Sequence, residues 1–234
     1  MDGMTAHRAK AAFLFGLTTS VLVAIACAAA SGQSSRSATK STRPSSLDSG
    51  NIKDGVYHNP SFGFSYKIPF GWVDRTEVMR QGDAQADPAQ SAKAQVLLAV
   101  FERPPEAPRR EVNSGVVIAI ESASSYPGLK AAVDYFGPLE EVTTSKGFKV
   151  VNEPYDFAVG EKSVPREDFS KEAGDKDAGE MTMHQTCLVL LQKGYILSLT
   201  FISDSDDNMD ELLAGLSFHP PPLPAHKHAT PPKK

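Results

Sequence analysis

The chain has 234 residues, 41% of them hydrophobic and two of them cysteine, and a formal net charge of −4 at pH 7. Its one stretch of globular composition, residues 51–218, contains 16 basic against 26 acidic residues. A domain of this size buries roughly two thirds of its unfolded surface and needs no disulfide or metal to fold. Its acidity disfavours nucleic acid and anionic lipid headgroups as partners of the folded part.

The first 30 residues have the layout of a secretory signal peptide. Arg8 and Lys10 precede an uncharged apolar run that ends in small residues. The sequence VAIAC, which ends at Cys27, resembles the lipobox of bacterial lipoproteins, in which the cysteine becomes the lipidated first residue. We therefore expect cleavage before Cys27, lipidation of Cys27 and a membrane anchor in the cell envelope, on the periplasmic side.

Two other interpretations of this segment remain open at this point. The sequence Ala28-Ala29-Ala30 also offers a site for ordinary cleavage, which would give a secreted protein without a lipid. The apolar run is also close to the roughly 20 residues that span a bilayer, so it could stay as an uncleaved anchor. Thr18, Thr19 and Ser20 weaken that last interpretation.

Two segments of biased composition flank the globular stretch. Residues 31–50 are rich in serine and threonine, which predicts a flexible linker because such a chain cannot bury enough surface to order itself. Residues 219–234, HPPPLPAHKHATPPKK, are rich in proline and basic, which predicts an extended or disordered tail. His226 and His228 in this tail could bind a divalent metal only weakly.

The globular stretch begins with the segment from Tyr57 to Trp72, YHNPSFGFSYKIPFGW. Phe64, Tyr66 and Ile68 alternate with polar residues, which predicts a strand with one buried face. Pro69 and Gly71 predict the end of the strand and a turn, and we expect the single tryptophan, Trp72, to fill the core.

The middle of the domain alternates between loops, short strands and a helix. Residues 73–95 have no clear period and predict mostly a loop, with a short helix around Ala89–Gln95. Apolar runs at 96–101 and 116–120 predict two interior strands. The sequence Ser124-Ser125-Tyr126-Pro127 predicts the start of a helix, and apolar residues at helical spacing follow it. Gly137-Pro138 should kink or break this helix, which then extends to about Thr144.

The last third of the domain predicts an antiparallel meander and a closing helix. Lys193-Gly194 is a two-residue hairpin turn, because glycine supplies a positive φ. Asp204–Asn208 predicts the start of a final helix that buries leucines up to Leu216. The predicted strands are Phe148–Asn152, Tyr155–Val159, Val164–Lys171, Met181–Gln192 and Tyr195–Ser203.

This element order and several short motifs resemble the PsbP-like family, which shares its fold with Mog-type Ran-binding proteins and some bacterial lipoproteins. The motifs are Tyr57…Phe62-Gly63-Phe64-Ser65-Tyr66…Pro69…Gly71-Trp72, Gly160 with Arg166-Glu167-Asp168-Phe169, Gly194-Tyr195-Ile196-Leu197 and Leu213…Leu216-Ser217-Phe218. The resemblance implies an α+β fold, a central antiparallel β-sheet flanked by helices in an α/β/α sandwich. It also implies a non-catalytic role in binding a protein partner, and it does not identify that partner.

The residues that could support catalysis are few. His58 lies on the opening turn, and His184 is predicted on a strand, on the solvated face with Thr182 and Thr186. Cys187 is predicted on the opposite face as a buried thiol, so strand alternation separates it from His184 and disfavours a Cys-His nucleophile. The motifs of serine hydrolases, zinc proteases, P-loops and dinucleotide sites are absent from the sequence. We expect no catalytic residues and no cofactor.

The best metal candidate in the sequence is the acidic run 203–211. Asp204, Asp206 and Asn208 match the first ligands of an EF-hand loop, but Met209 replaces its glycine and Gly215 its final glutamate. Acids in the first turn of a helix also stabilise the helix dipole. We therefore expect helix capping here and no metal site.

These observations predict a non-enzymatic, lipid-anchored monomer that binds an unknown protein of the bacterial cell envelope. A carrier of a small ligand or metal in the periplasm is the alternative. A hydrolase would require His58 or His184 to meet an acid and a nucleophile in a pocket.

Overall fold

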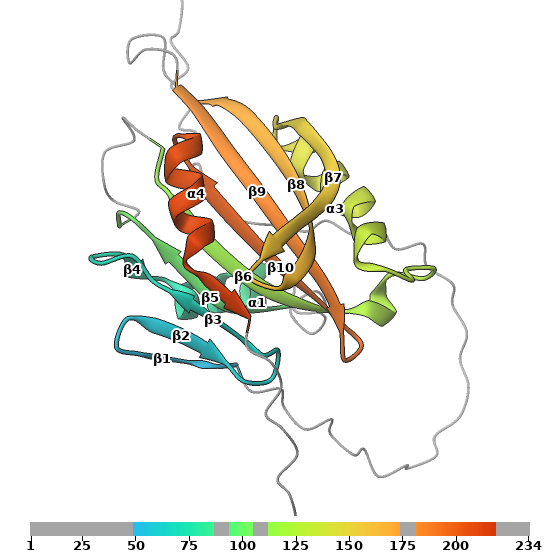
Figure 1. Ribbon diagram of the computed structural model, residues 1–234, viewed down its shortest axis with the longest axis horizontal. Helices are drawn as coiled ribbons and strands as arrows, with labels where there is room; N and C mark the ends of the chain where they lie inside the picture. The colour runs from blue at the N-terminus through green and yellow to red at the C-terminus, as the bar shows by residue number, and fades with distance from the viewer. Residues whose placement is uncertain (1–48, 87–93, 105–111, 174–180, 219–234) are drawn as a thin grey trace, which may run out of the picture.

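The computed structural model describes residues 49–86, 94–104, 112–173 and 181–218. Its largest element is a seven-stranded antiparallel sheet (Figure 1). In spatial order the strands are β4 (Val73–Asp74), β5 (Ala94–Phe101), β6 (Gly115–Ser122), β10 (Tyr195–Ser203), β9 (Met181–Gln192), β8 (Lys162–Ala173) and β7 (Lys149–Val159).

A second, four-stranded antiparallel sheet joins the two ends of the domain. Its strands, in spatial order, are β1 (Asn51–Lys53), β2 (Val56–Asn59), β3 (Phe64–Lys67) and β11 (Leu216–Phe218). β11 pairs with β3 in the register Leu216 to Tyr66 and Phe218 to Phe64. The last described residues therefore lie beside the opening segment of the domain.

Both faces of the large sheet are covered, but by unlike layers. On one face, the small sheet and helix α4 (Asp206–Ala214) close the main core. On the other face, α3 (Phe136–Ser145) and the 3₁₀ helix η2 (Ala132–Tyr135) pack near β7–β9, and α1 (Thr76–Ala86) packs on β5. The predicted antiparallel sheet is confirmed. The single sheet of an α/β/α sandwich is only partly matched, because a second sheet takes part of one helical layer.

The alternation of β10 shows how the sequence builds this arrangement. Leu197, Leu199 and Phe201 are fully buried in the main core, and Ile196 is buried on the opposite face with Phe169. A strand that is apolar on both faces must lie inside the sheet, and β10 lies between β6 and β9. Burying each such side chain contributes about 1.5–3 kcal/mol.

Local patterns located several elements correctly. β9 and β10 have the predicted bounds, and Lys193 and Gly194 have φ of 55° and 76°, as a type I′ turn requires. α4 begins after Ser205, whose hydroxyl accepts a hydrogen bond from the Asn208 amide at 3.3 Å. The two strands predicted between Phe148 and Val159 are one strand, β7, with register shifts around Asn152.

Two helix predictions were wrong in position. Residues 76–86 form α1 although they were predicted as a loop. Of the short helix predicted at Ala89–Gln95, residues 89–93 lie outside the described residues, and Ala94 and Gln95 begin the strand β5 instead. The predicted helix start near Ser124 is instead the 3₁₀ helix η1 (Ala123–Ser125). The α-helix α3 begins at Phe136, so Gly137-Pro138 lies in its first turn. Proline is tolerated there because the first amides of a helix have no intrahelical acceptor.

Among the described residues, no helix combines the length and apolarity that crossing a bilayer requires.

Candidate functional site

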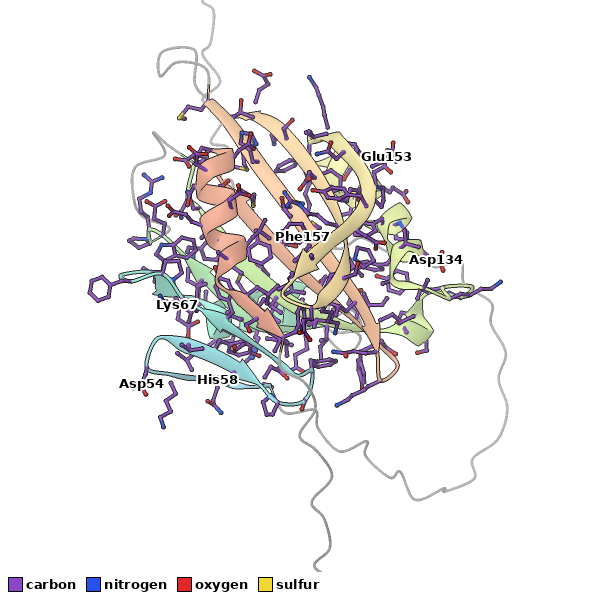
Figure 2. All side chains as sticks on the ribbon, viewed as in Figure 1. Asp54, His58, Lys67, Asp134, Glu153 and Phe157 are labelled. Atoms are coloured by element: carbon purple, nitrogen blue, oxygen red, sulfur yellow. The ribbon has the colours of Figure 1, made fainter. Side chains whose placement is uncertain are left out.

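An open groove of about 850 Å³ lies at one edge of the domain, where residues of the two sheets meet. The β1–β2 turn and the start of β2 form one wall, and the segment that connects β3 to β4 forms the other. Asp54 at the turn and Lys67 at the end of β3 lie on this side of the molecule (Figure 2). The backbone links the two walls, since the Ile68 amide donates to the Gly55 carbonyl at 2.9 Å.

The local sequence forces an aromatic side chain out of this wall. Pro69 follows β3, and the Trp72 amide donates to the Pro69 carbonyl at 3.3 Å, which closes a tight turn. Gly71 has a φ of 83°, the positive value that the third residue of a type II turn needs. Phe70 is then the second residue of the turn, and its side chain is fully exposed.

Trp72 is only partly buried, which corrects the expectation that it fills the core. It packs at the margin of the main core together with Ile68, and both side chains line the groove. The predicted burial of Phe64 and Tyr66 is confirmed, at 1% and 0% exposure. The opening segment therefore contributes core residues from its strand and surface residues from its turn.

The rim of the groove has two acids and one base. Asp54 has a φ of 51°, in the left-handed region that aspartate and asparagine tolerate. Asp74 accepts hydrogen bonds from the Thr76 amide at 2.9 Å and the Thr76 hydroxyl at 2.6 Å, and so caps α1. Lys67 is exposed. The groove is thus apolar and aromatic with a slightly negative rim.

A polar cluster around Asp168 lies on the face of the sheet that bears α4. The Asp168 carboxylate accepts hydrogen bonds from Arg166 Nε at 2.8 Å, Thr186 Oγ1 at 2.6 Å, Tyr155 Oη at 2.8 Å and Asn152 Nδ2 at 3.1 Å. Burial raises the pKa of Asp168, but these donors and the Arg166 charge outweigh it and leave the pKa below its usual value. The Arg166 guanidinium also covers the Phe157 ring at 4.8 Å. This cluster has its donors and acceptors matched, which is typical of a structural network.

Glu167, the next residue, has the opposite environment. Strand alternation turns it to the other face of β8, where its side chain is fully buried and pairs across the ladder with Cys187. Neither carboxyl oxygen has a hydrogen-bond partner among the described residues. Burial, followed by the charges of Glu140, Glu153 and Asp168, raises the pKa of Glu167 to about 7.

A third buried carboxyl, Glu121 on β6, forms hydrogen bonds to the segment that contains the 3₁₀ helices η1 and η2. Its two oxygens accept hydrogen bonds from Tyr126 at 2.5 Å and Tyr135 at 2.6 Å. The two tyrosine rings meet edge to face with centroids 5.1 Å apart. This contact positions residues 123–135 against β6 without a regular helix.

The structure does not bring the histidines to the groove. His58 is exposed on β2, and neither His58 nor His184 lines the groove. His184 Nδ1 lies 3.1 Å from Asp206 Oδ1 at the start of α4. Ser170 is the cross-strand neighbour of His184, but no hydrogen bond joins the two among the described residues. His184 therefore contacts the acid Asp206 but makes no hydrogen bond to the Ser170 hydroxyl. A serine nucleophile needs both contacts on the same histidine.

Cys187 is fully buried, as strand alternation predicted, and burial raises the pKa of its thiol to about 11. The predicted solvated face with Thr182, His184 and Thr186 was wrong in part. Thr186 is buried, because it lies in the Asp168 cluster. A buried thiol with a raised pKa has little of the thiolate that nucleophilic chemistry needs.

The acidic run at the start of α4 acts as a cap. Asp204 Oδ1 accepts a hydrogen bond from Asn208 Nδ2 at 3.1 Å, and the Ser205 hydroxyl caps the helix. Among the described residues, no group of three or more histidines, cysteines or acids could hold a metal ion. Cys27, His226 and His228 lie outside the described residues.

Sequence reasoning missed the exposure of Phe70 and the contrast between Asp168 and Glu167. The turn signature Pro69-Phe70-Gly71 could have found the first, because the second residue of such a turn points outward. The contrast between Asp168 and Glu167 depends on which hydrogen-bond donors face each side of β8. These donors include residues of the neighbouring strands β7 and β9, so the sequence of β8 alone does not indicate them.

Comparison with known proteins gives only distant similarities. No model of a known protein family matches the chain, and no curated protein matches its sequence. In structure, the chain is similar to cyanobacterial PsbP (CyanoP) from Synechocystis sp. PCC 6803, with 12% identity over 70% of this chain and 91% of that chain and a TM-score of 0.44. It is also similar to LpqN of Mycobacterium tuberculosis, a protein involved in cell envelope biogenesis, with 12% identity over 67% and 83% of the two chains and a TM-score of 0.36. Overlap this low assigns neither a family nor a function to this chain.

Proposed function

We propose that this chain is an exported, lipid-anchored protein without catalytic activity that binds a protein partner of the bacterial cell envelope through the groove beside Phe70. The fully exposed phenylalanine on a tight turn carries this proposal. Aromatic side chains that fill a pocket of the partner contribute much of the binding energy at protein interfaces. A turn fixed by Pro69 and Gly71 presents such a side chain with little loss of conformational entropy on binding.

The shape of the groove distinguishes this role from that of a small-molecule carrier. Sites for small ligands are concave and bury most of the ligand surface. This groove is open, and Phe70, one of the residues that line it, is fully exposed to solvent. The geometry supports contact with an extended surface or segment of a protein.

Phe70→Ala is expected to weaken partner binding about 30-fold or more, since hot-spot aromatics contribute about 2 kcal/mol or more. The same change should leave the free energy of unfolding within about 0.5 kcal/mol, because the side chain makes no buried contact. Site-specific photocrosslinking in intact cells measures this. A photoreactive phenylalanine at position 70 should give one discrete adduct.

The matched control is the same photoreactive residue at position 78, since Val78 is an exposed apolar residue on α1. Position 78 should give no adduct. Once the adduct is identified, titration of that protein with the purified chain and with Phe70→Ala gives the affinity ratio. Equal affinities of the two chains, or adducts of equal yield from both positions, would contradict the proposal.

The membrane anchor is tested separately. Cys27→Ser should abolish metabolic incorporation of a fatty acid and move the protein from the membrane to the soluble fraction, because the lipobox cysteine is the predicted acceptor. Cys187→Ala changes the other cysteine of the chain and should retain the label. An unmodified mature N-terminus at Ser31 would show that the protein is secreted without a lipid.

A further inference from the structure

We propose that the groove beside Phe70 binds the chain's own C-terminal segment, residues 219–234, as an extended proline-rich strand. This inference rests on the proposed use of the groove for binding protein segments. It names the occupant of the groove in the free protein, which an envelope partner would have to displace.

The chemistry of the segment matches that of the groove. The sequence HPPPLPAHKHATPPKK has six prolines, Leu223 as its one large apolar side chain, three lysines and no acid. Proline-rich segments favour the polyproline II conformation and dock on surfaces lined by aromatic rings, because little conformational entropy is lost on binding. Trp72 and Phe70 provide such rings, and Ile52 and Ile68 extend the apolar surface.

Charge adds to this match. Asp54 and Asp74 lie on the rim of the groove against the single base Lys67. The lysines of the segment can therefore approach two carboxylates. Both acids are close to solvent, so this contribution is modest and decreases as salt is added.

The segment can reach the groove within one molecule. The described chain ends at Phe218, which is the cross-strand partner of Phe64, and the groove begins three residues farther along β3 at Lys67. That interval is about 10 Å at the rise of a strand. Sixteen residues of polyproline II extend over about 50 Å, which leaves enough length for the chain to reverse its direction and cross the groove.

Trp72 makes this contact directly measurable, because it is the only tryptophan of the chain and lines the groove. The experiment compares the full chain with the variant Pro222→Ser/Leu223→Ser/Pro224→Ser, which leaves residues 49–218 intact. In the full chain, Trp72 should emit at shorter wavelength and be quenched less by acrylamide. A synthetic peptide of sequence 219–234 should restore both properties when added to the variant.

The full chain should respond to the same peptide about tenfold more weakly, because a tethered segment competes at an effective concentration of about 1 mM against a peptide dissociation constant of about 0.1 mM. Asp54→Asn, which suits the left-handed backbone at that position, should weaken peptide binding to the triple variant and reduce its salt dependence. A peptide with the same three serine substitutions is the negative control.

Three results would overturn the proposal. The first is identical Trp72 emission and quenching in the full chain and the triple variant, with no response to the peptide. The second is peptide binding that persists after Phe70→Ala. The third is a Trp72 signal of the full chain that changes on dilution from about 50 to 1 μM, which would assign the segment to a second copy. If the first result appears while Phe70→Ala still weakens capture of the envelope partner, the proposed function stands and the tail proposal fails.

Discussion

Asp168→Ala is expected to lower the free energy of unfolding at pH 7 by about 3–5 kcal/mol, the usual cost of removing one partner of a buried ion pair. The change leaves the largely buried Arg166 guanidinium without its carboxylate, and the Thr186 hydroxyl loses its acceptor. Denaturant unfolding monitored by circular dichroism measures the effect. We place this change among the most destabilising single substitutions of a polar residue in the domain.

Asp156→Ala provides the matched control, because Asp156 is an exposed acid on the neighbouring strand β7. It should change the stability by no more than about 0.5 kcal/mol. The pH dependence gives a second readout. Since the pKa of Asp168 is lowered in the folded state, its contribution is present above the unfolded pKa and is lost as the pH falls. A loss below about 1 kcal/mol for Asp168→Ala would contradict this account.

Glu167→Gln is expected to raise the free energy of unfolding at neutral pH, whereas Asp168→Ala lowers it. The pKa of Glu167 is raised to about 7, so ionisation in the folded state is penalised. The unfolded chain releases this proton near pH 4.5, and stability therefore decreases as the pH rises from about 4.5 to 7 and then stays level. Each pKa unit corresponds to about 1.36 kcal/mol, so the variant should gain about 3 kcal/mol on the parent over that interval.

The measurement is the difference between the stability curves of parent and variant from pH 4.5 to 8. Glu172→Gln is the control, because Glu172 is an exposed acid on the same strand β8. Its difference curve should be flat to within about 0.5 kcal/mol. Parallel curves for the parent and Glu167→Gln would show that the Glu167 carboxyl reaches water or a hydrogen-bond donor in solution.

These two neighbours show where prediction from the sequence ends. Strand alternation correctly places consecutive residues on opposite faces of β8. It does not say which face offers donors to a carboxylate. Arg166 and Thr186 surround Asp168 because β8 pairs with β9 in one register, and a slip by one residue would exchange the environments of the two acids.

The opening segment, Tyr57–Trp72, also has features that its sequence predicts and features that depend on the tertiary structure. The apolar alternation of Phe64 and Tyr66 was enough to predict a buried face, and Pro69 with Gly71 was enough to predict a turn. The environment of the turn residues depended on the β1–β2 turn and on β4, which lie across the groove. Trp72 is therefore only partly buried at the margin of the core, although tryptophan is highly buried on average.

The sequence by itself determined the antiparallel meander, the Lys193-Gly194 hairpin, the capped start of α4 and the burial of Cys187. Each of these follows from a short-range period, a positive φ or a helix cap, which are properties of a few consecutive residues. Only the tertiary structure decided the α1 helix, the pairing of β11 with β3, the contrast between Asp168 and Glu167, and the partial burial of Trp72. These depend on contacts between residues far apart in the chain, and pairing energies of that kind leave no local pattern.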